Sequence, residues 1–263
     1  TGLGLAIVFH GAGMGSLAAL ALIATLYHCL NHALMKSLLF LGTGAVLHAT
    51  GERNLGRLGG LIHRMPWVAW LTLVGCLAIA GLPPLNGFVS EWLLLQAFLF
   101  ANEVPHTFVN MLLPIGGAVI ALCTALAGYV MVKFFGVIFL GQPREVALVN
   151  AHDAGLLEKL GMAWLALGCL LLGVLPAQVI AGLGAVSQDL LGVSLPRAGN
   201  EWWLLVPLDE RPVSYGPLPI LLLGLVIVGL TVLLVQRLYH RRLRRGPARD
   251  CGVERPDTRM QGA

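Results

Sequence analysis

The chain has 263 residues, of which 57% are hydrophobic and 11% are charged, and its mean hydropathy is +0.81. A composition this apolar excludes an ordinary soluble domain and indicates an all-α polytopic membrane protein, a bundle of transmembrane helices. The net charge of +4 does not imply a nucleic-acid partner, because most of the excess lies in one run beside the last apolar segment, QRLYHRRLRRGPAR.

Apolar stretches predict the helices, since a helix needs about 20 such residues to cross the hydrocarbon layer. The predicted helices cover residues 1–12, 17–49, 66–101, 109–139, 158–176 and 216–238. The first has neither a basic segment before it nor a cleavage site, so it is not a signal peptide, and the chain is expected to begin within a helix, as a fragment. Lys and Arg are concentrated in alternate loops and in the C-terminal run, which places that run in the cytoplasm.

The five cysteines are spread singly, and none forms a C-x-x-C pair. Such spacing predicts neither a disulfide framework nor a zinc or iron–sulfur site, so the sequence implies no metal and no cofactor. The cysteines within apolar spans are expected to be small core residues: Cys29, Cys76, Cys123 and Cys169.

A polar stripe interrupts the second predicted helix at HCLNHALMK, residues 28–36. His28, His32 and Lys36 are four residues apart, so each lies about 40° round the helix and about 6 Å along it from the last. One water could link neighbouring groups at that rise, and histidine both takes and gives a proton near neutral pH. These side chains either bond neighbouring helices and hold the bundle together or transfer protons. Proton transfer is favoured, because a lysine at a helix centre costs about 2.5 to 3.5 kcal/mol to insert.

The third predicted helix contains GLPPLNGFVSEW, whose glycines and prolines predict a break within the membrane and a restart near Asn86. The residues assigned to this break are Gly81, Pro83, Pro84, Asn86 and Gly87. Half-helices of this kind build ion and proton sites in many transporters. Glu91 follows the restart and is the one carboxylate clearly within an apolar span, so it is expected to transfer protons; the alternative is a structural partner for a lysine or histidine.

Three motifs in this order resemble the antiporter-like membrane subunits of respiratory complex I, Mrp-type cation/proton antiporters and membrane-bound hydrogenases. They are HCLNHALMKSLLFLGTGAVLHATGERNLGRLGGLIHRMPW, AIAGLPPLNGFVSEW and MVKFFGVIFLGQPR. The similarity is in particular to the hydrogenase-4 component B and formate hydrogenlyase membrane subunit branch, whose C-terminal linker the tail RDCGVERPDTRMQ also resembles.

The resemblance implies two inverted five-helix repeats, each with a broken helix, and this chain would hold the second half. Lys36 matches the lysine of the family's H-x-x-x-H-x-x-x-K helix, and Glu91 matches the charged residue after the second broken helix, where some relatives have lysine. Residues 1–140 are then the second repeat, 141–239 are peripheral C-terminal helices, and 240–263 are a basic cytoplasmic tail or linker. The first repeat and the branch's last helix are absent from the sequence, so this chain alone is not expected to pump.

Three functions remain open. The first is proton translocation within a hydrogenase-4-like, formate hydrogenlyase-like or complex I-like oxidoreductase of the bacterial inner membrane. The others are a subunit of a sodium/proton antiporter and a structural anchor for a redox complex. No redox motif is present, so the chain is expected to have no catalytic centre of its own and to rely on membrane and peripheral partner subunits.

Estimated depths in the bilayer predict a proton route from Lys36 to His32, to His28 and across to Glu91, before release on the outer side. The route requires the three residues of the stripe to face the helix that contains Glu91, and Glu91 to turn into the bundle.

Overall fold

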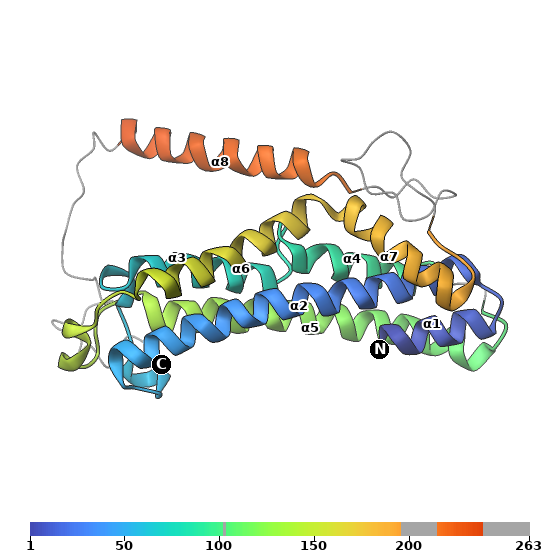
Figure 1. Cartoon of the computed structure of the whole chain (residues 1–263), viewed down its shortest axis with the longest axis horizontal. Coiled ribbons are helices and arrows are strands. Elements are labelled where there is room, and N and C mark those ends of the chain that lie inside the picture. The colour runs from blue at the N-terminus through green and yellow to red at the C-terminus, as the bar shows by residue number, and fades with distance from the viewer. Residues whose placement is uncertain (102–103, 196–214, 239–263) are drawn as a thin grey trace.

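The computed structural model describes residues 1–101, 104–195 and 215–238, and this part of the chain is helical with no strand (Figure 1). The helices are α1 (Gly2–Gly11), α2 (Gly15–Thr50), α3 (Pro66–Ile79), α4 (Asn86–Leu99), α5 (Thr107–Phe139), α6 (Leu156–Val174), α7 (Pro176–Leu191) and α8 (Pro217–Leu238). The predicted all-α class is therefore confirmed. The predicted basic tail, 240–263, lies outside the described residues.

Among the described residues, four helices are long and apolar enough to cross a membrane: α2, α5, α6 and α8. With 36 residues, α2 is about 54 Å long at about 1.5 Å per residue, well beyond the ~30 Å hydrocarbon layer. By contrast, α3 and α4 have 14 residues each, so neither crosses alone and the two halves together make one span. The chain is a polytopic membrane protein.

The central helix is α2, which packs against α1, α3, α4, α6 and α7. Every residue from Leu17 to Ala24 is buried, as expected of a helix segment that is apolar all round. The C-terminal half of α2 buries one face only, at positions three and four residues apart. That face consists of Met35, Leu38, Leu39, Gly42, Ala45 and Val46. No described part of the chain covers the opposite face of this half of α2.

The break between α3 and α4 lies where it was predicted. Gly81 has φ +66°, a left-handed conformation that favours glycine, and α4 begins at Asn86. Glycines allow two close backbone approaches here: a Cβ on Gly87 would overlap the carbonyl oxygen of Ala78, and one on Gly173 of α6 would overlap that of Pro84. The break is therefore packed directly against α6.

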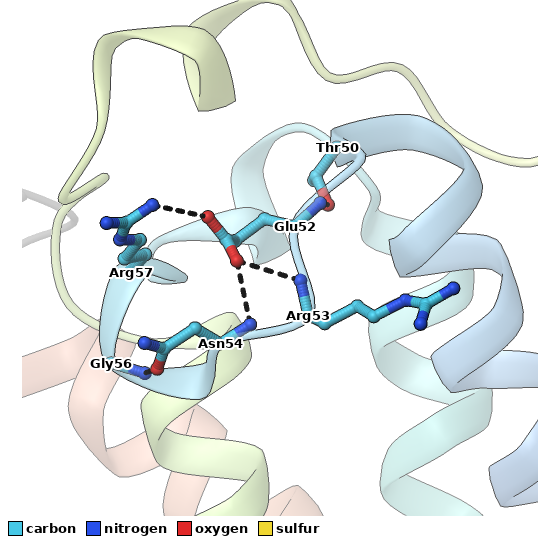
Figure 2. Close-up of polar contacts among 6 residues, drawn as sticks. All are labelled: Thr50, Glu52, Arg53, Asn54, Gly56 and Arg57. Atoms are coloured by element: carbon cyan, nitrogen blue, oxygen red, sulfur yellow. Dashed lines mark hydrogen bonds and ion pairs between the residues drawn. The ribbon is translucent and has the colours of Figure 1, made fainter.

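The connections after α2 and after α5 lie at the same end of the bundle and interlock (Figure 1). The Gly60 N–H donates to the Leu140 carbonyl at 2.8 Å, and Arg144 Nη1 donates to the Leu55 carbonyl at 3.2 Å. Within the connection after α2, the Glu52 carboxylate accepts the backbone N–H groups of Arg53 and Asn54 (Figure 2). Two loops that are about 80 residues apart in sequence thus form one folded unit.

The connection before α6 also holds the start of α3. Asp153 accepts the backbone N–H groups of Trp67 at 3.1 Å and Val68 at 3.4 Å, which are free donors in the first turn of the helix. Lys159 lies 3.4 Å from the same carboxylate. A side chain from the connection before α6 therefore caps α3.

Two features differ from the sequence predictions. Pro176 begins α7, a helix that was not predicted, and α7 packs against α2. Cys76 and Cys169 are buried as expected, but Cys29 and Cys123 are exposed. The prediction of core positions was wrong for these two, because they lie on faces of α2 and α5 that no other described helix covers.

Candidate proton-transfer site

A buried polar cluster joins the middle of α2 to the start of α4. Asn31 is fully buried, and its Nδ2 donates to the Asn86 carbonyl at 2.8 Å and to Ser90 Oγ at 3.2 Å. Asn86, also fully buried, points Nδ2 back at the Asn31 carbonyl at 3.4 Å. These contacts hold α2 at the point where the broken helix restarts.

His28 belongs to this cluster and is half-buried. Its Nδ1 lies 3.1 Å from Ser90 Oγ, and the Ser90 hydroxyl also contacts the Gly87 carbonyl at 3.2 Å. The ring centroids of His28 and His32 are 5.9 Å apart with an interplanar angle of 33°. The structure therefore brings one imidazole of the stripe to α4, with the next imidazole beside it.

The other two residues of the predicted stripe, His32 and Lys36, are exposed on the uncovered face of α2. The stripe turns about 80° round the helix from His28 to Lys36, so α4 covers one end of it and leaves the other end open. Of the three side chains, only that of His28 has a hydrogen bond to α4 among the described residues, so the requirement that the whole stripe face the helix of Glu91 is met by His28 and not by His32 or Lys36.

Glu91 lies one residue after Ser90 and faces a different neighbour. It is half-buried, and its Oε2 accepts a hydrogen bond from Thr124 Oγ1 of α5 at 3.1 Å. A Cβ built on Gly81 would lie 2.6 Å from the same oxygen, so the carboxylate rests over the helix break. In the described part of the chain, no hydrogen bond or ion pair joins Glu91 to His28, His32 or Lys36.

The residues predicted to form the break have separate roles. Gly81 faces the carboxylate, Gly87 allows contact with α3, and Asn86 bonds α2. Pro83 and Pro84 lie in the turn between the half-helices, where their missing N–H groups are not needed by a helix.

Two polar partners, Asn31 and Thr124, were not predicted from the sequence. Asn31 had a usable signal, because it lies three residues after His28 on the same helix and is polar within a membrane span. Thr124 had none, since a single hydroxyl in an apolar helix commonly bonds its own backbone.

Two oxygens of the cluster lack donors. Asn31 Oδ1 and Asn86 Oδ1 are buried, and neither has a hydrogen-bond partner among the described residues. The same residues include no group of three His, Cys, Asp or Glu side chains able to hold a metal ion. The cluster thus offers acceptors for water or a cation, together with one titratable ring at its edge.

Residues 4–120 match the family model described as NADH:quinone oxidoreductase/Mrp antiporter, TM. Formate hydrogenlyase subunit 3 of Escherichia coli (strain K12) is 40% identical over 184 residues, which are 70% of this chain and 30% of that protein. Na(+)/H(+) antiporter subunit A1 of Staphylococcus aureus (strain JH9) is 33% identical over 235 residues, 88% of this chain and 28% of that protein. In the structure of the membrane-bound sulfane sulfur reductase, an archaeal respiratory membrane complex, one chain superimposes with a TM-score of 0.68 at 29% identity. That likeness covers 89% of this chain and 35% of the other.

The chain therefore spans 28% to 35% of the length of these relatives. The matched residues contain the polar stripe, the helix break and Glu91, so the resemblance predicted from the motifs is confirmed. Residues 4–120 are therefore similar to the NADH:quinone oxidoreductase/Mrp antiporter transmembrane family.

Proposed function

We propose that this chain is part of a proton-translocating subunit of an oxidoreductase complex of the formate hydrogenlyase or hydrogenase-4 type. One observation carries the proposal: the His28 imidazole contacts Ser90 at the restart of a broken membrane helix, one residue from the intramembrane carboxylate of Glu91. Intramembrane histidines and carboxylates mark proton pathways, and broken helices form ion and substrate sites in many transporters.

In this proposal, Lys36 receives a proton and passes it to His32 and then to His28, with about one water between neighbours. His28 then passes the proton through water to Glu91, and Glu91 releases it on the outer side of the membrane. Because His32 and Lys36 are exposed on α2, the route needs further protein to cover them, since lipid would be a costly neighbour for an ammonium group. The greater length of the relatives supports such cover.

The proposed orientation places the connection after α2 in the cytoplasm. Arg53, Arg57 and Arg64 lie in that connection and Arg144 lies in the loop that interlocks with it. The end of α8 with Arg237 is at the same end of the molecule (Figure 1). A concentration of Lys and Arg at one end of a helix bundle is typical of the cytoplasmic side.

A second candidate is a subunit of a sodium/proton antiporter. The observation that favours it is the pair of buried carboxamide oxygens, Asn31 Oδ1 and Asn86 Oδ1, for which no described residue supplies a donor, because hard cations prefer oxygen ligands. Ser90 Oγ is the next oxygen of the cluster, bonded to the Asn31 side chain. In this case, transport would depend on sodium and would not need a redox substrate.

The test is transport by the complete complex reconstituted into vesicles and driven by the redox substrate. With Glu91→Gln, we expect proton movement to fall about tenfold or more while redox subunits remain bound. The matched control is Glu158→Gln, which changes an exposed carboxylate at the start of α6 and should transport like wild type. Sodium-dependent transport without redox substrate would support the antiporter. If Glu91→Gln and Lys36→Ala affect assembly alone, the chain is a structural anchor.

A further inference from the structure

The Ser90 hydroxyl has three hydrogen-bonding neighbours. Its Oγ lies 3.2 Å from Asn31 Nδ2, 3.1 Å from His28 Nδ1 and 3.2 Å from the Gly87 carbonyl oxygen. A serine hydroxyl has one hydrogen to donate and two lone pairs to accept with. All three contacts are satisfied only if two of the neighbours donate and one accepts.

The orientation of Asn31 follows from its other contact. The side-chain atom 2.8 Å from the Asn86 carbonyl oxygen has to be a donor, because that oxygen can only accept. It is therefore Nδ2, whose two hydrogens go to the Asn86 carbonyl and to Ser90 Oγ. Asn31 thus occupies one of the two lone pairs of Ser90.

The single hydroxyl hydrogen of Ser90 can then be donated to only one acceptor if all three hydrogen bonds are to be kept. The Gly87 carbonyl oxygen can only accept, so the hydroxyl donates to it. The second lone pair of Ser90 remains for His28 Nδ1, which must carry a hydrogen to complete the contact. If the hydroxyl donated to Nδ1 instead, the cluster would contain one hydrogen bond fewer.

We propose that Ser90, held in place by Asn31, is a positioning residue that keeps neutral His28 in the tautomer with its hydrogen on Nδ1. The inference rests on the proposed proton-transfer function and adds to it the atom at which transfer occurs. With Nδ1–H bonded to Ser90, Nε2 is the one basic atom of the ring.

Proton transfer at His28 then uses a single atom. A proton that arrives on Nε2 produces an imidazolium whose Nδ1–H bond to Ser90 is unchanged. When a proton leaves from Nε2, the ring returns to the same neutral tautomer, so charge and hydrogens balance without a ring flip. Ser90 orients the ring and does not conduct, and the proton continues to Glu91 through water that reaches Nε2.

The test is solid-state nitrogen-15 NMR of the full-length subunit in lipid, labelled on histidine and recorded where His28 is neutral. A matched His28→Gln sample identifies the His28 signals by their loss. We expect a protonated Nδ1 and an unprotonated Nε2 in wild type. In Ser90→Ala, the ratio of the Nδ1–H to the Nε2–H tautomer should fall about two- to tenfold, the equilibrium value of one neutral hydrogen bond.

Ser16→Ala is the control, because it removes an exposed hydroxyl at the start of the same helix and should leave the tautomer ratio unchanged. An Nε2–H tautomer in wild type would overturn the inference even if no variant were made. An unchanged ratio in Ser90→Ala would overturn the role of Ser90. A complex that moves no protons but shows Nδ1–H would instead refute the proposed function and leave the tautomer assignment standing.

Discussion

Asn31 Nδ2 lies 2.8 Å from the backbone carbonyl of Asn86, so the central helix is bonded directly to the first residue of the second half-helix. Both side chains are fully buried. A contact between residues 55 positions apart thus sets the depth of the helix break relative to the polar stripe.

Asn31→Leu removes the two bonds that Nδ2 donates, while the volume of the side chain changes little. We expect the free energy of unfolding to fall by about 1 to 3 kcal/mol, from two hydrogen bonds at about 0.5 to 1.5 kcal/mol each. The measurement is thermal or denaturant unfolding of the purified full-length subunit. Cys29→Ala, an exposed position on the same helix, should be neutral, and equal stability of the two variants would contradict the importance of the Asn31 bonds.

Gly87→Ala should damage the helix break. A Cβ at this position would overlap the Ala78 carbonyl oxygen, which is backbone and cannot move aside. We expect a loss of about 1 to 3 kcal/mol in stability, or failure to assemble, because the two half-helices must separate. Gly128→Ala in α5 is the matched control, since nothing lies within 4 Å of its added Cβ and alanine favours a helix. The prediction is wrong if both variants melt at the same temperature.

Lys36→Ala in the complete complex should leave assembly intact and lower proton movement about tenfold or more, because a central link of the proposed route is lost. The control is Lys133→Ala, which removes an exposed lysine from α5. Proton uptake by vesicles is the measurement, with subunit content checked on the same sample. Wild-type transport by Lys36→Ala would remove Lys36 from the route.

Glu52 predicts a pH dependence of stability. The backbone N–H of Asn54, then that of Arg53 and the Arg57 guanidinium, hold the pKa of the Glu52 carboxyl below its ordinary value (Figure 2). A depressed pKa in the folded state means that the carboxylate stabilises the fold above the ordinary glutamate pKa, and that this contribution is lost as the pH falls through the folded-state pKa.

The variant Glu52→Gln should therefore unfold more easily than wild type at neutral pH, and the difference should shrink as the medium becomes acidic. Melting temperatures measured from about pH 7 to about pH 3 test this. In an Arg57→Ala background, Glu52→Gln should still lower the melting temperature at neutral pH by most of the same amount, because the Asn54 N–H is the largest cause of the lowered Glu52 pKa. A gap between wild type and Glu52→Gln that does not change with pH would contradict the assignment.

Topology can be tested with single cysteines in a cysteine-free background. Arg57→Cys and His106→Cys lie at opposite ends of the bundle, after α2 and before α5. We expect a membrane-impermeant reagent to label Arg57→Cys from the cytoplasmic side and His106→Cys from the outside. Labelling of both from one side would mean that α3 and α4 do not together cross the membrane.

The parts of the structure that depend on local chemistry were predictable. Proline and glycine act on their own backbone, so the break before Asn86 followed from residues 81 to 87 alone. The apolar spans followed from hydropathy in the same way. The sequence did not predict α7, because its 16 residues are too few for a membrane span and its first residue, Pro176, coincides with the predicted end of the helix over 158–176.

The site depends instead on which helix faces pack against each other, and the spacing of polar residues along one helix does not determine that packing. His28, His32 and Lys36 form one stripe on the helix, yet only His28 bonds α4, because the edge of the packed face lies between the first and second of them. Asn31 could have been singled out as polar, but its partner Asn86 is defined only by how α2 crosses the restart of the broken helix.

The first half of the broken helix is held at both ends by the same neighbour. Asp153, just before α6, caps its first turn, and Gly173, at the far end of α6, rests on the Pro84 carbonyl beyond its last turn. With 19 residues, α6 is a rigid helix about 28 Å long, and it runs from the loops at one end of the bundle to the buried centre. A conformational change in those loops would therefore reach the helix break as a joint displacement of α3 and α6.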